Sequence, residues 1–214
     1  MIVVTGSKGF IGQHLCERLK GEGENIEELD LADGRNLTST ILATYGVSKV
    51  FHLAAQTNAY CADAILDANT NISGTLRLLE EYRSKVIFTS TAMVNYPVNP
   101  YAISKRACED YCRYYGAAVV RLPNVYGPGG HSFIDKCNKN SSITIFGDGN
   151  QLRTWVHVEK VVDALMAARP GSFNIVRGWN ATIKEIAARY DKPIHYAAAR
   201  SGDLQVATQI ETLS

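Results

Sequence analysis

The chain has 214 residues, of which 46% are hydrophobic, with 22 basic and 21 acidic side chains. This length favours one large domain or a domain with a small appendage, and the balanced charge gives no sign of a nucleic-acid partner or an anionic membrane. The N-terminus lacks the segments of a signal peptide, and no apolar run is long enough to span a membrane. Five cysteines without a C-x-x-C pair argue against a disulfide framework or a metal site. We therefore expect a cytoplasmic protein without a metal.

The first predicted element is a short buried strand over residues 1–5, followed by a glycine turn and then by a helix. Glycines in this context let the backbone approach a pyrophosphate at the positive end of the helix. The alternative is a glycine-rich turn without a ligand, but its place between a strand and a helix favours nucleotide binding. The residues predicted to contact the nucleotide here are Gly6, Gly9, Phe10, Ile11 and Gly12.

A second strand over residues 25–29 ends at Asp30, eighteen positions after Gly12. An acid at this distance is expected at the adenosine ribose, where it favours NAD and repels the 2′-phosphate of NADP. Lys8 and Arg35 would weaken that preference. Asp33 either reaches the adenine region or caps a helix predicted over residues 37–45.

A third strand over residues 49–53 ends in small residues that leave room for a flat cofactor at the edge of the sheet. The residues concerned are Leu53, Ala54 and Ala55. His52 in this strand is expected to be a packed core histidine. A long helix over residues 63–82 follows, and polar and small residues around Asn71 interrupt its apolar stripe.

A strand over residues 85–89 ends in Ser90 and Thr91, again at the edge of the sheet where ligands bind. The next helix, over residues 100–115, carries Tyr101 and Lys105 one turn apart on the same face. A free tyrosine is a poor base at neutral pH, but a nearby ammonium favours the phenolate and lowers the tyrosine pKa. The pair is therefore a candidate general acid/base, although such pairs also arise by chance on exposed helix faces.

Further strands at 117–121 and 173–176, with a helix at 159–168, continue the alternation of strands and helices, which predicts an α/β fold with a doubly wound, Rossmann-type parallel sheet. Thr182 is expected to cap a last helix that ends near residue 190. We expect a nucleotide-binding domain over 1–124 and about 155–177. A reduced C-terminal substrate-binding lobe would comprise about 125–154 and 178–214.

Several segments in this order carry a family resemblance: TGSKGFIG, FHLAA, NTNISGT, FTSTAMV, YAISK and RLPNVYGPG. Together they resemble the extended short-chain dehydrogenase/reductase family, and within it the NAD-dependent nucleotide-sugar epimerases and dehydratases, most of all the UDP-glucose/UDP-galactose 4-epimerases. The segments IFGDGNQLRTWVHVEKVVDAL and RSGD continue the match. Each motif is weak, but the ordered set covers nearly the whole chain and is specific.

The resemblance implies roles for individual residues. Tyr101 would be the acid/base, Lys105 its activator and ribose anchor, and Thr91 its hydroxyl partner, with Ser90 as the alternative. In this family the tyrosine takes a proton from a sugar hydroxyl while NAD takes hydride from the same carbon, and a 4-epimerase returns the hydride to the opposite face. Beyond the glycine turn, the NAD-binding residues expected are Asp30, Asp33, Leu53, Ala54, Ala55, Asn71, Ser90, Tyr101 and Lys105.

The same resemblance gives the residues expected to bind the nucleotide-diphosphate sugar. Asn124 matches an asparagine that contacts the sugar nucleotide, and Arg153 matches an arginine that holds the diphosphate. Arg200 and Asp203 match an RxGD element that holds the diphosphate and the nucleotide ribose. Two arginines suit a diphosphate because guanidinium groups donate paired hydrogen bonds to phosphate oxygens; without the flanking motifs, surface arginines in weak ion pairs would be the better interpretation.

Departures from the family pattern limit the inference. Only ten positions separate Thr91 from Tyr101, whereas the family has a longer loop there. Ala92 and Met93 replace the acid pair of 4,6-dehydratases, so that activity is not expected. The chain also ends before the usual C-terminal helix, and the substrate site is expected to be open or completed by a second subunit.

The leading interpretation is an NAD-dependent 4-epimerase of a UDP-sugar. The alternatives are a 4-keto-sugar-nucleotide reductase using NAD(P)H and a dinucleotide-sensing protein without catalysis. The helices at 63–82 and 100–115 resemble the pair that forms a dimer interface in this family, so a homodimer is expected, although their apolar residues could equally belong to the core.

Overall fold

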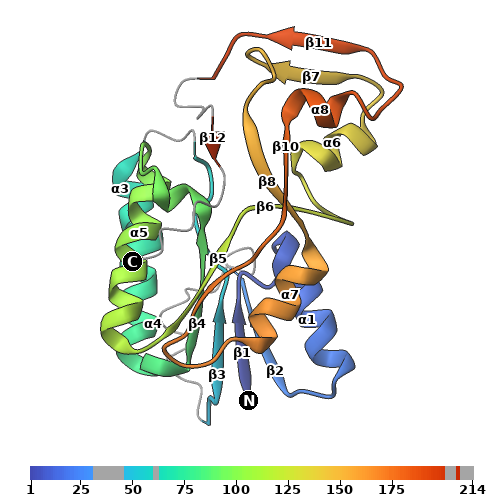
Figure 1. Ribbon diagram of the computed structural model, residues 1–214. Helices are drawn as coiled ribbons and strands as arrows, with labels where there is room; N and C mark the ends of the chain where they lie inside the picture. The colour runs from blue at the N-terminus through green and yellow to red at the C-terminus, as the bar shows by residue number, and fades with distance from the viewer. Residues whose placement is uncertain (31–45, 60–62, 201–205, 208–214) are drawn as a thin grey trace.

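A central parallel sheet of six strands organises the computed structural model, which describes residues 1–30, 46–59, 63–200 and the backbone of 206–207 (Figure 1). The strand order is β2-β1-β3-β4-β5-β9, and every neighbouring pair is parallel. The predicted doubly wound parallel sheet is confirmed. Its strands are β1 (Ile2–Thr5), β2 (Ile26–Leu29), β3 (Lys49–His52), β4 (Val86–Thr91), β5 (Ala118–Leu122) and β9 (Phe173–Ile175).

Helices cover both faces of this sheet, because the central strands carry apolar side chains on both sides. Neighbouring residues show the alternation: Val4 packs with α1 (Phe10–Gly21) and α7 (Val158–Ala167), whereas Val3 packs with α4 (Gly74–Tyr82) and α5 (Pro100–Tyr115). Figure 1 shows these two helix pairs on opposite sides of the strands. The core is therefore built on both faces of short buried strands, such as the one that the sequence predicts over residues 1–5.

The helix expected over residues 63–82 forms, but it is not uniform. A π-helical segment, Ala68–Ser73, separates α3 (Ala64–Asp67) from α4. The segment contains the polar interruption noted in the sequence, and it places the buried Asn71 toward α5. Such π segments occur often at functional sites.

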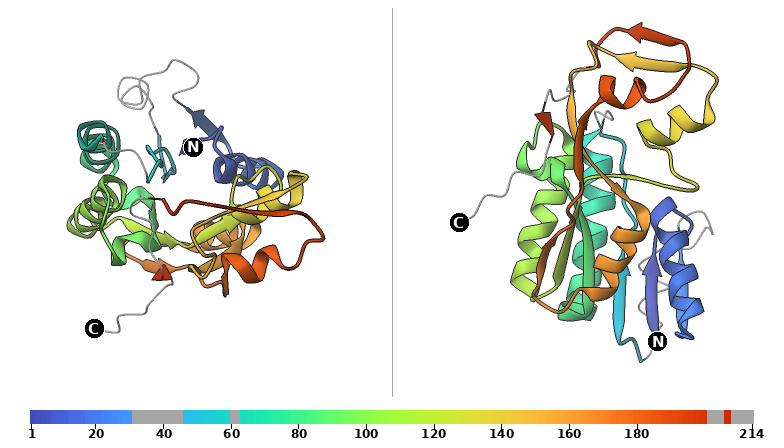
Figure 2. Two further views of the ribbon diagram at one scale, coloured as in Figure 1. Left: turned by 90° about the horizontal axis from the view of Figure 1, so that it is seen from above. Right: turned by 45° about the vertical axis from the view of Figure 1, so that its right-hand side comes forward.

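A second layer of structure stands over the carboxyl ends of the central strands (Figure 2, right). Its strands form two small sheets, with β6 and β10 on either side of β8 and with β7 paired to β11. Its elements are β6 (Asn124–Tyr126), α6 (Phe133–Lys139), β7 (Ile143–Phe146), β8 (Leu152–His157), β10 (Trp179–Thr182), α8 (Ile183–Ala187), β11 (Ile194–Ala197) and β12 (Val206–Ala207). We call this layer the lobe.

One boundary between the central sheet and the lobe differs from the boundary predicted from the sequence. The segment 155–157, expected in the nucleotide-binding domain, belongs to β8 in the lobe, and α7 then returns to the central sheet. Thr182 caps α8 in a capping box with Glu185, as predicted, although the helix ends at Ala187 and is shorter than expected. Trp155, 2% exposed, is the largest side chain of the lobe core.

Two cysteines and one histidine of the central domain are buried in its interior. Cys108 and Cys112, one turn apart on α5, are buried free thiols. His52 is a core histidine whose two ring nitrogens contact the hydroxyls of Thr5 at 2.7 Å and Thr75 at 3.0 Å. Within the ranges described, no helix combines the length and the apolar character needed to cross a bilayer.

A buried ion pair fixes α5 to the central sheet. Arg121 of β5 donates two hydrogen bonds to Glu109 of α5, at 3.0 and 2.6 Å, and a third to Asn95 Oδ1 at 3.0 Å. The two charged side chains are only 13% and 5% exposed. Because both are largely removed from water, each depends on the other for its solvation.

We expect Glu109→Ala to lower the free energy of unfolding by about 3 kcal/mol, since it leaves the Arg121 guanidinium buried without its counter-charge. Urea unfolding followed by circular dichroism measures this. Asp110→Ala is the matched control: its ion pair with Arg113 is exposed, and its loss should cost less than about 1 kcal/mol. Equal losses for the two variants would contradict the assignment.

Candidate active site

A cavity of about 470 Å³ opens at the carboxyl ends of the central strands. It lies at the ends of the paired strands β1 and β3, whose following helices cover opposite faces of the sheet, and crevices at such points bind ligands in open α/β sheets. Most residues predicted to contact a dinucleotide line it: Gly6, Gly9, Phe10, Ile11, Gly12, Asp30, Leu53, Ala54, Ala55, Ser90, Tyr101 and Lys105, together with the predicted catalytic Thr91.

The glycine turn is shaped for close approach of a ligand. Gly6 has φ +71°, and a Cβ there would lie 2.6 Å from the Ala54 nitrogen. A Cβ at Gly12 would overlap the Gly6 carbonyl oxygen. Gly9 precedes α1 without a side-chain cap, and the first turn of α1 carries no acid. The backbone N–H groups of this helix end are therefore available to an anion.

The surroundings of the turn fit a dinucleotide. Asp30, at the end of β2, accepts a hydrogen bond from the Lys8 backbone N–H at 3.0 Å, which holds its carboxylate beside the turn. The hydroxyl oxygens of Ser7 and Ser90 are buried without a hydrogen-bond partner among the described residues. Unsatisfied hydroxyls beside a glycine cradle are what a site completed by a polar ligand would contain.

Tyr101, Lys105 and Thr91 meet in this cavity, as the spacing of the first two predicts. Burial raises the pKa of Tyr101 to about 12, a rise that a hydrogen bond from Thr91 partly offsets. The sequence interpretation, in which Lys105 lowers the tyrosine pKa, does not hold for the protein alone, where burial sets the direction of the shift and the group that lowers the pKa is Thr91. A further positive charge beside the phenol is needed to favour the phenolate.

Lys105 is 3% exposed and donates a hydrogen bond to the Thr89 carbonyl at 2.9 Å. Its Nζ also lies 4.5 Å from the centre of the Phe88 ring. Burial lowers the pKa of this ammonium to about 8, since the site withholds the water that a charge prefers. The side chain thus carries a proton that it can share with a neighbouring ribose or phenol at neutral pH.

Asn71, predicted to bind the cofactor, lies beneath the cavity and not in its lining. Its amide contacts the Gln56 carbonyl and Asp67 Oδ1 at 3.0 Å and Ser104 Oγ at 2.9 Å, and its Oδ1 accepts from the Gln56 N–H at 2.8 Å. The residue is 2% exposed. Its contacts hold the segment after β3, the π-helical segment and α5 together under the site.

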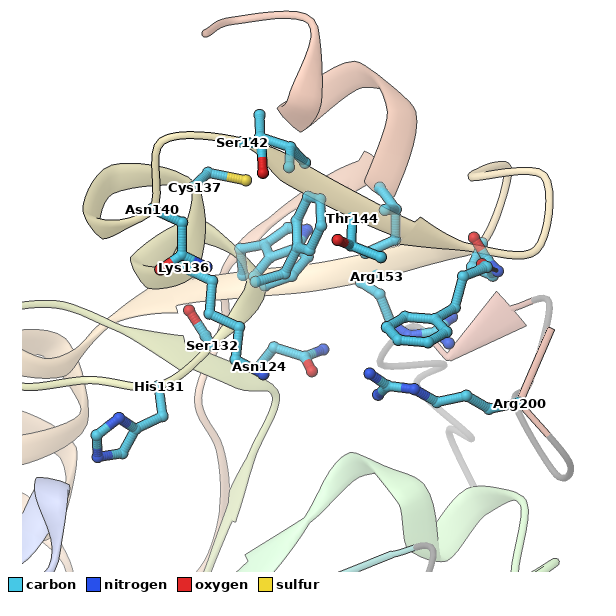
Figure 3. A pocket seen from close by; sticks show the side chains of 16 residues that line it. Asn124, His131, Ser132, Lys136, Cys137, Asn140, Ser142, Thr144, Arg153 and Arg200 are labelled. Atoms are coloured by element: carbon cyan, nitrogen blue, oxygen red, sulfur yellow. Dashed lines mark hydrogen bonds between the residues drawn. The ribbon is translucent and has the colours of Figure 1, made fainter. Parts of the chain in front are cut away.

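A second cavity of about 320 Å³ lies in the lobe (Figure 3). Three predicted substrate residues line it, Asn124, Arg153 and Arg200, and Figure 3 shows Arg200 extending its guanidinium toward Asn124. The Arg200 guanidinium also stacks on the Phe146 ring at 3.7 Å. Lys136 adds another cation, and the described residues that line the cavity include no acid. This charge pattern suits a diphosphate.

The two cavities adjoin at His131, which lines both. Asn124 and Val125, neighbours on β6, line the lobe cavity and the central cavity in turn. A ligand that fills the lobe cavity can therefore reach the tyrosine from the side of β6. Asp33 and Asp203 lie outside the described residues.

Sequence reasoning missed part of both linings. In the central cavity the additional residues are Thr57, Thr89, Leu122, Pro123, Val125 and His131. The position of Thr89 in the sequence could have predicted its place in the cavity, because it directly precedes Ser90 and Thr91 at the end of the same strand. The lobe residues Lys136, Thr144 and Phe146 could not be predicted in this way, because they come together only through the packing of α6 and β7 around the cavity.

Comparisons with known proteins agree with this geometry. The profile of the "NAD dependent epimerase/dehydratase family" matches residues 2–175. A protein described as a putative UDP-glucose 4-epimerase from Methanocaldococcus jannaschii is 30% identical, with 90% of this chain and 86% of the relative covered. That alignment spans 262 positions, more than the 214 residues of this chain, so the relative contains segments that this chain lacks.

Two further proteins show that the similar proteins differ in the reactions they catalyse. The structure of UDP-glucose 4-epimerase from Thermus thermophilus in complex with NAD superimposes with a TM-score of 0.83 at 26% identity, covering 96% of this chain and 89% of that one. UDP-glucuronic acid decarboxylase 1 of Arabidopsis thaliana is 28% identical, with 87% of this chain and 56% of the relative covered. Similar sequences thus carry out different reactions on nucleotide sugars.

We expect Gly12→Ala to weaken dinucleotide binding by about tenfold to a hundredfold, or 1.4 to 2.8 kcal/mol, because the new Cβ displaces the Gly6 carbonyl in the turn. Isothermal titration calorimetry with NAD measures the change. Gly21→Ala, at the far end of α1 with nothing within 4 Å of the new Cβ, should leave the affinity unchanged. Wild-type affinity in the Gly12 variant would show that the dinucleotide binds elsewhere.

Proposed function

The chain belongs to the NAD-dependent epimerase/dehydratase family, and from that premise we propose that it uses NAD to epimerise a nucleotide-diphosphate sugar of the UDP-glucose/UDP-galactose type at C4. The observation that carries the proposal is the meeting of Tyr101, Lys105 and Thr91 in the glycine-turn cavity, next to a lobe cavity lined by cations. The diphosphate would occupy the lobe cavity and the sugar would reach Tyr101 past Asn124.

NAD would be held by the glycine turn, by Asp30 at the adenosine ribose and by Lys105 at the nicotinamide ribose. Asp30 supports NAD over NADP, since a 2′-phosphate beside its carboxylate would be repelled. When bound, NAD supplies reversible hydride exchange with the sugar carbon. Its positive nicotinamide ring also supplies the charge that Tyr101 lacks in the protein alone.

Tyr101 takes the proton from the C4 hydroxyl as the C4–H bond breaks, which leaves a ketone at C4. The same phenol returns the proton when the C4–H bond forms again on the opposite face, so the reaction has no net oxidation. Thr91, hydrogen-bonded to Tyr101, is placed to orient the same sugar oxygen. Ala92 and Met93 follow Thr91 and carry no acid or base, which supports epimerisation over 4,6-dehydration.

The test is incubation of the protein with UDP-glucose, UDP-galactose and their N-acetyl forms, with products identified by NMR. We expect C4 epimers in equilibrium and no net change in the nicotinamide absorbance. Net oxidation of NADPH with a 4-keto sugar would instead support a reductase. Failure to convert any of these sugars with NAD bound would leave a dinucleotide sensor as the better interpretation.

Tyr101→Phe should lower the turnover number by about 10²- to 10⁴-fold while NAD still binds, because the phenol proton carrier is lost and the ring that lines the site is kept. Tyr111→Phe is the control, since that tyrosine is 40% exposed on the outer part of α5. The proposal fails if the Tyr101 variant retains full activity.

We also propose that the protein is a homodimer through α3, α4 and α5. The outer surface of these helices carries large apolar side chains that the chain itself does not cover, among them Ile65 (75% exposed), Ile103 (53%) and Tyr114 (80%). The three helices lie on one side of the molecule in Figure 1. Two copies of this surface would bury such side chains against each other.

Light scattering at micromolar concentration should give twice the chain mass of 23.5 kDa. Ile103→Asp should shift the mass to that of one chain, because it places a charge in the apolar surface. Tyr196→Asp, on β11 of the lobe and 59% exposed, should leave the dimer intact. A monomeric wild-type protein would contradict this proposal without affecting the proposed reaction.

A further inference from the structure

A buried carboxyl group lies below the catalytic tyrosine. Asp67, the last residue of α3, is 1% exposed. Its Oδ1 accepts a hydrogen bond from Asn71 Nδ2 at 3.0 Å, whereas its Oδ2 is buried without a partner among the described residues. Carboxylates removed from water normally accept hydrogen bonds at both oxygens. An acid kept in this position calls for an explanation beyond packing.

The carboxyl is connected to the backbone of Tyr101 through two side chains. The Asn71 amide that contacts Asp67 also lies 2.9 Å from Ser104 Oγ. Ser104 in turn donates to the Tyr101 carbonyl oxygen at 2.9 Å. Asp67, Asn71 and Ser104 thus fix the π-helical segment against the first turn of α5, which carries the tyrosine.

The charge of Asp67 acts on the same phenol. Burial is the main cause of the raised Tyr101 pKa, the hydrogen bond from Thr91 lowers it, and the Asp67 carboxylate raises it further. Burial also raises the pKa of Asp67 itself, with a contribution from the charge of Asp63. A negative charge near a phenol disfavours the phenolate.

Other titratable groups around Asp67 and Tyr101 come from three elements. Lys105 and Glu109 of α5 are a buried cation and a buried carboxylate that acts on it, and Asp63, at the start of α3, is an exposed carboxylate. His52 of β3, near Lys105, has a pKa lowered to about 3 by burial and by the lysine charge, so it is neutral at working pH. Among these charged groups, Asp67 is the one whose charge raises the Tyr101 pKa.

We propose that Asp67 is a positioning residue for the reaction: it holds the first turn of α5 through Asn71 and Ser104, and its charge keeps Tyr101 in the phenol form until cofactor and substrate are bound, which sets the pH range of activity. The proposal rests on the proposed function only in taking Tyr101 as the acid/base. Because a fixed negative charge beside Tyr101 disfavours the phenolate, it makes that phenolate a stronger base and favours uptake of the sugar proton.

The test is a titration of Tyr101 in the NAD-loaded protein labelled with ¹³C at tyrosine Cζ, with the resonance assigned by its loss in Tyr101→Phe. Asp67→Asn keeps a side-chain oxygen for Asn71 and removes the charge. We expect the pKa of Tyr101 to fall by roughly half to one unit, and the rise of turnover with pH to move to lower pH by the same amount.

Asp110→Asn is the matched control, because it removes one exposed carboxylate from α5 and should shift neither curve. Asp67→Ala gives the same charge change without adding a buried amide donor, so it replaces the asparagine variant if that variant does not fold. A Tyr101 pKa that is unchanged or higher in the folded variant overturns the proposal. Because the titration needs no substrate, its outcome is independent of whether a UDP-sugar is epimerised.

Discussion

The hydrogen bond from the Lys105 ammonium to the Thr89 carbonyl, at 2.9 Å, connects α5, which carries Tyr101, to the sheet beside the central cavity. The accepting residue, Thr89, lies in β4 and is followed directly by Ser90 and Thr91. The same strand end therefore holds the cation and carries the hydroxyl that contacts Tyr101. The buried pair of Arg121 and Glu109 fixes the helix one turn further along, so α5 is held to the sheet by charged groups at successive turns.

Holding a cation in this place has a cost that function explains. Lowering the Lys105 pKa from 10.5 to about 8 means that the folded protein binds that proton less tightly than the unfolded chain does. At neutral pH this destabilises the fold by about 3 kcal/mol, and the loss is recovered as the pH rises from about 8 to 10.5. Tyr101 is buried as a neutral phenol beside it. A cationic nicotinamide ring next to the phenol would favour the phenolate that the protein alone disfavours, so cofactor binding and activation of the base are coupled.

How much of this the sequence predicts depends on whether a residue acts through its neighbours in the chain or through distant segments. Gly6, Gly9 and Gly12 are identified by their place between a strand and a helix, and Tyr101 and Lys105 by their helical spacing. Asn71 was found as a polar interruption, but its contacts with Gln56 and Ser104 depend on a π-helical turn that no local pattern specifies. Lys136 and His131 were missed because their positions depend on how the lobe closes over the sheet. The pKa of Tyr101 was misjudged because spacing gives the partner of a group but not its burial.

The short connection before Tyr101 shows how the chain keeps the site with fewer residues. Thr91 accepts a hydrogen bond from the Met93 N–H at 3.3 Å, Asn99 caps α5 by accepting from the Ala102 N–H at 2.8 Å, and Pro100 begins the helix. The connection is thus closed by its own hydrogen bonds, and the tyrosine keeps its place beside Thr91. Of residues 91–100, all of which the structure describes, Thr91 alone lines either cavity. In the proposed function, recognition of the substrate away from the reacting carbon would therefore be left to β6, α6 and the segment at Arg200, where the cations that line the lobe cavity suit a diphosphate.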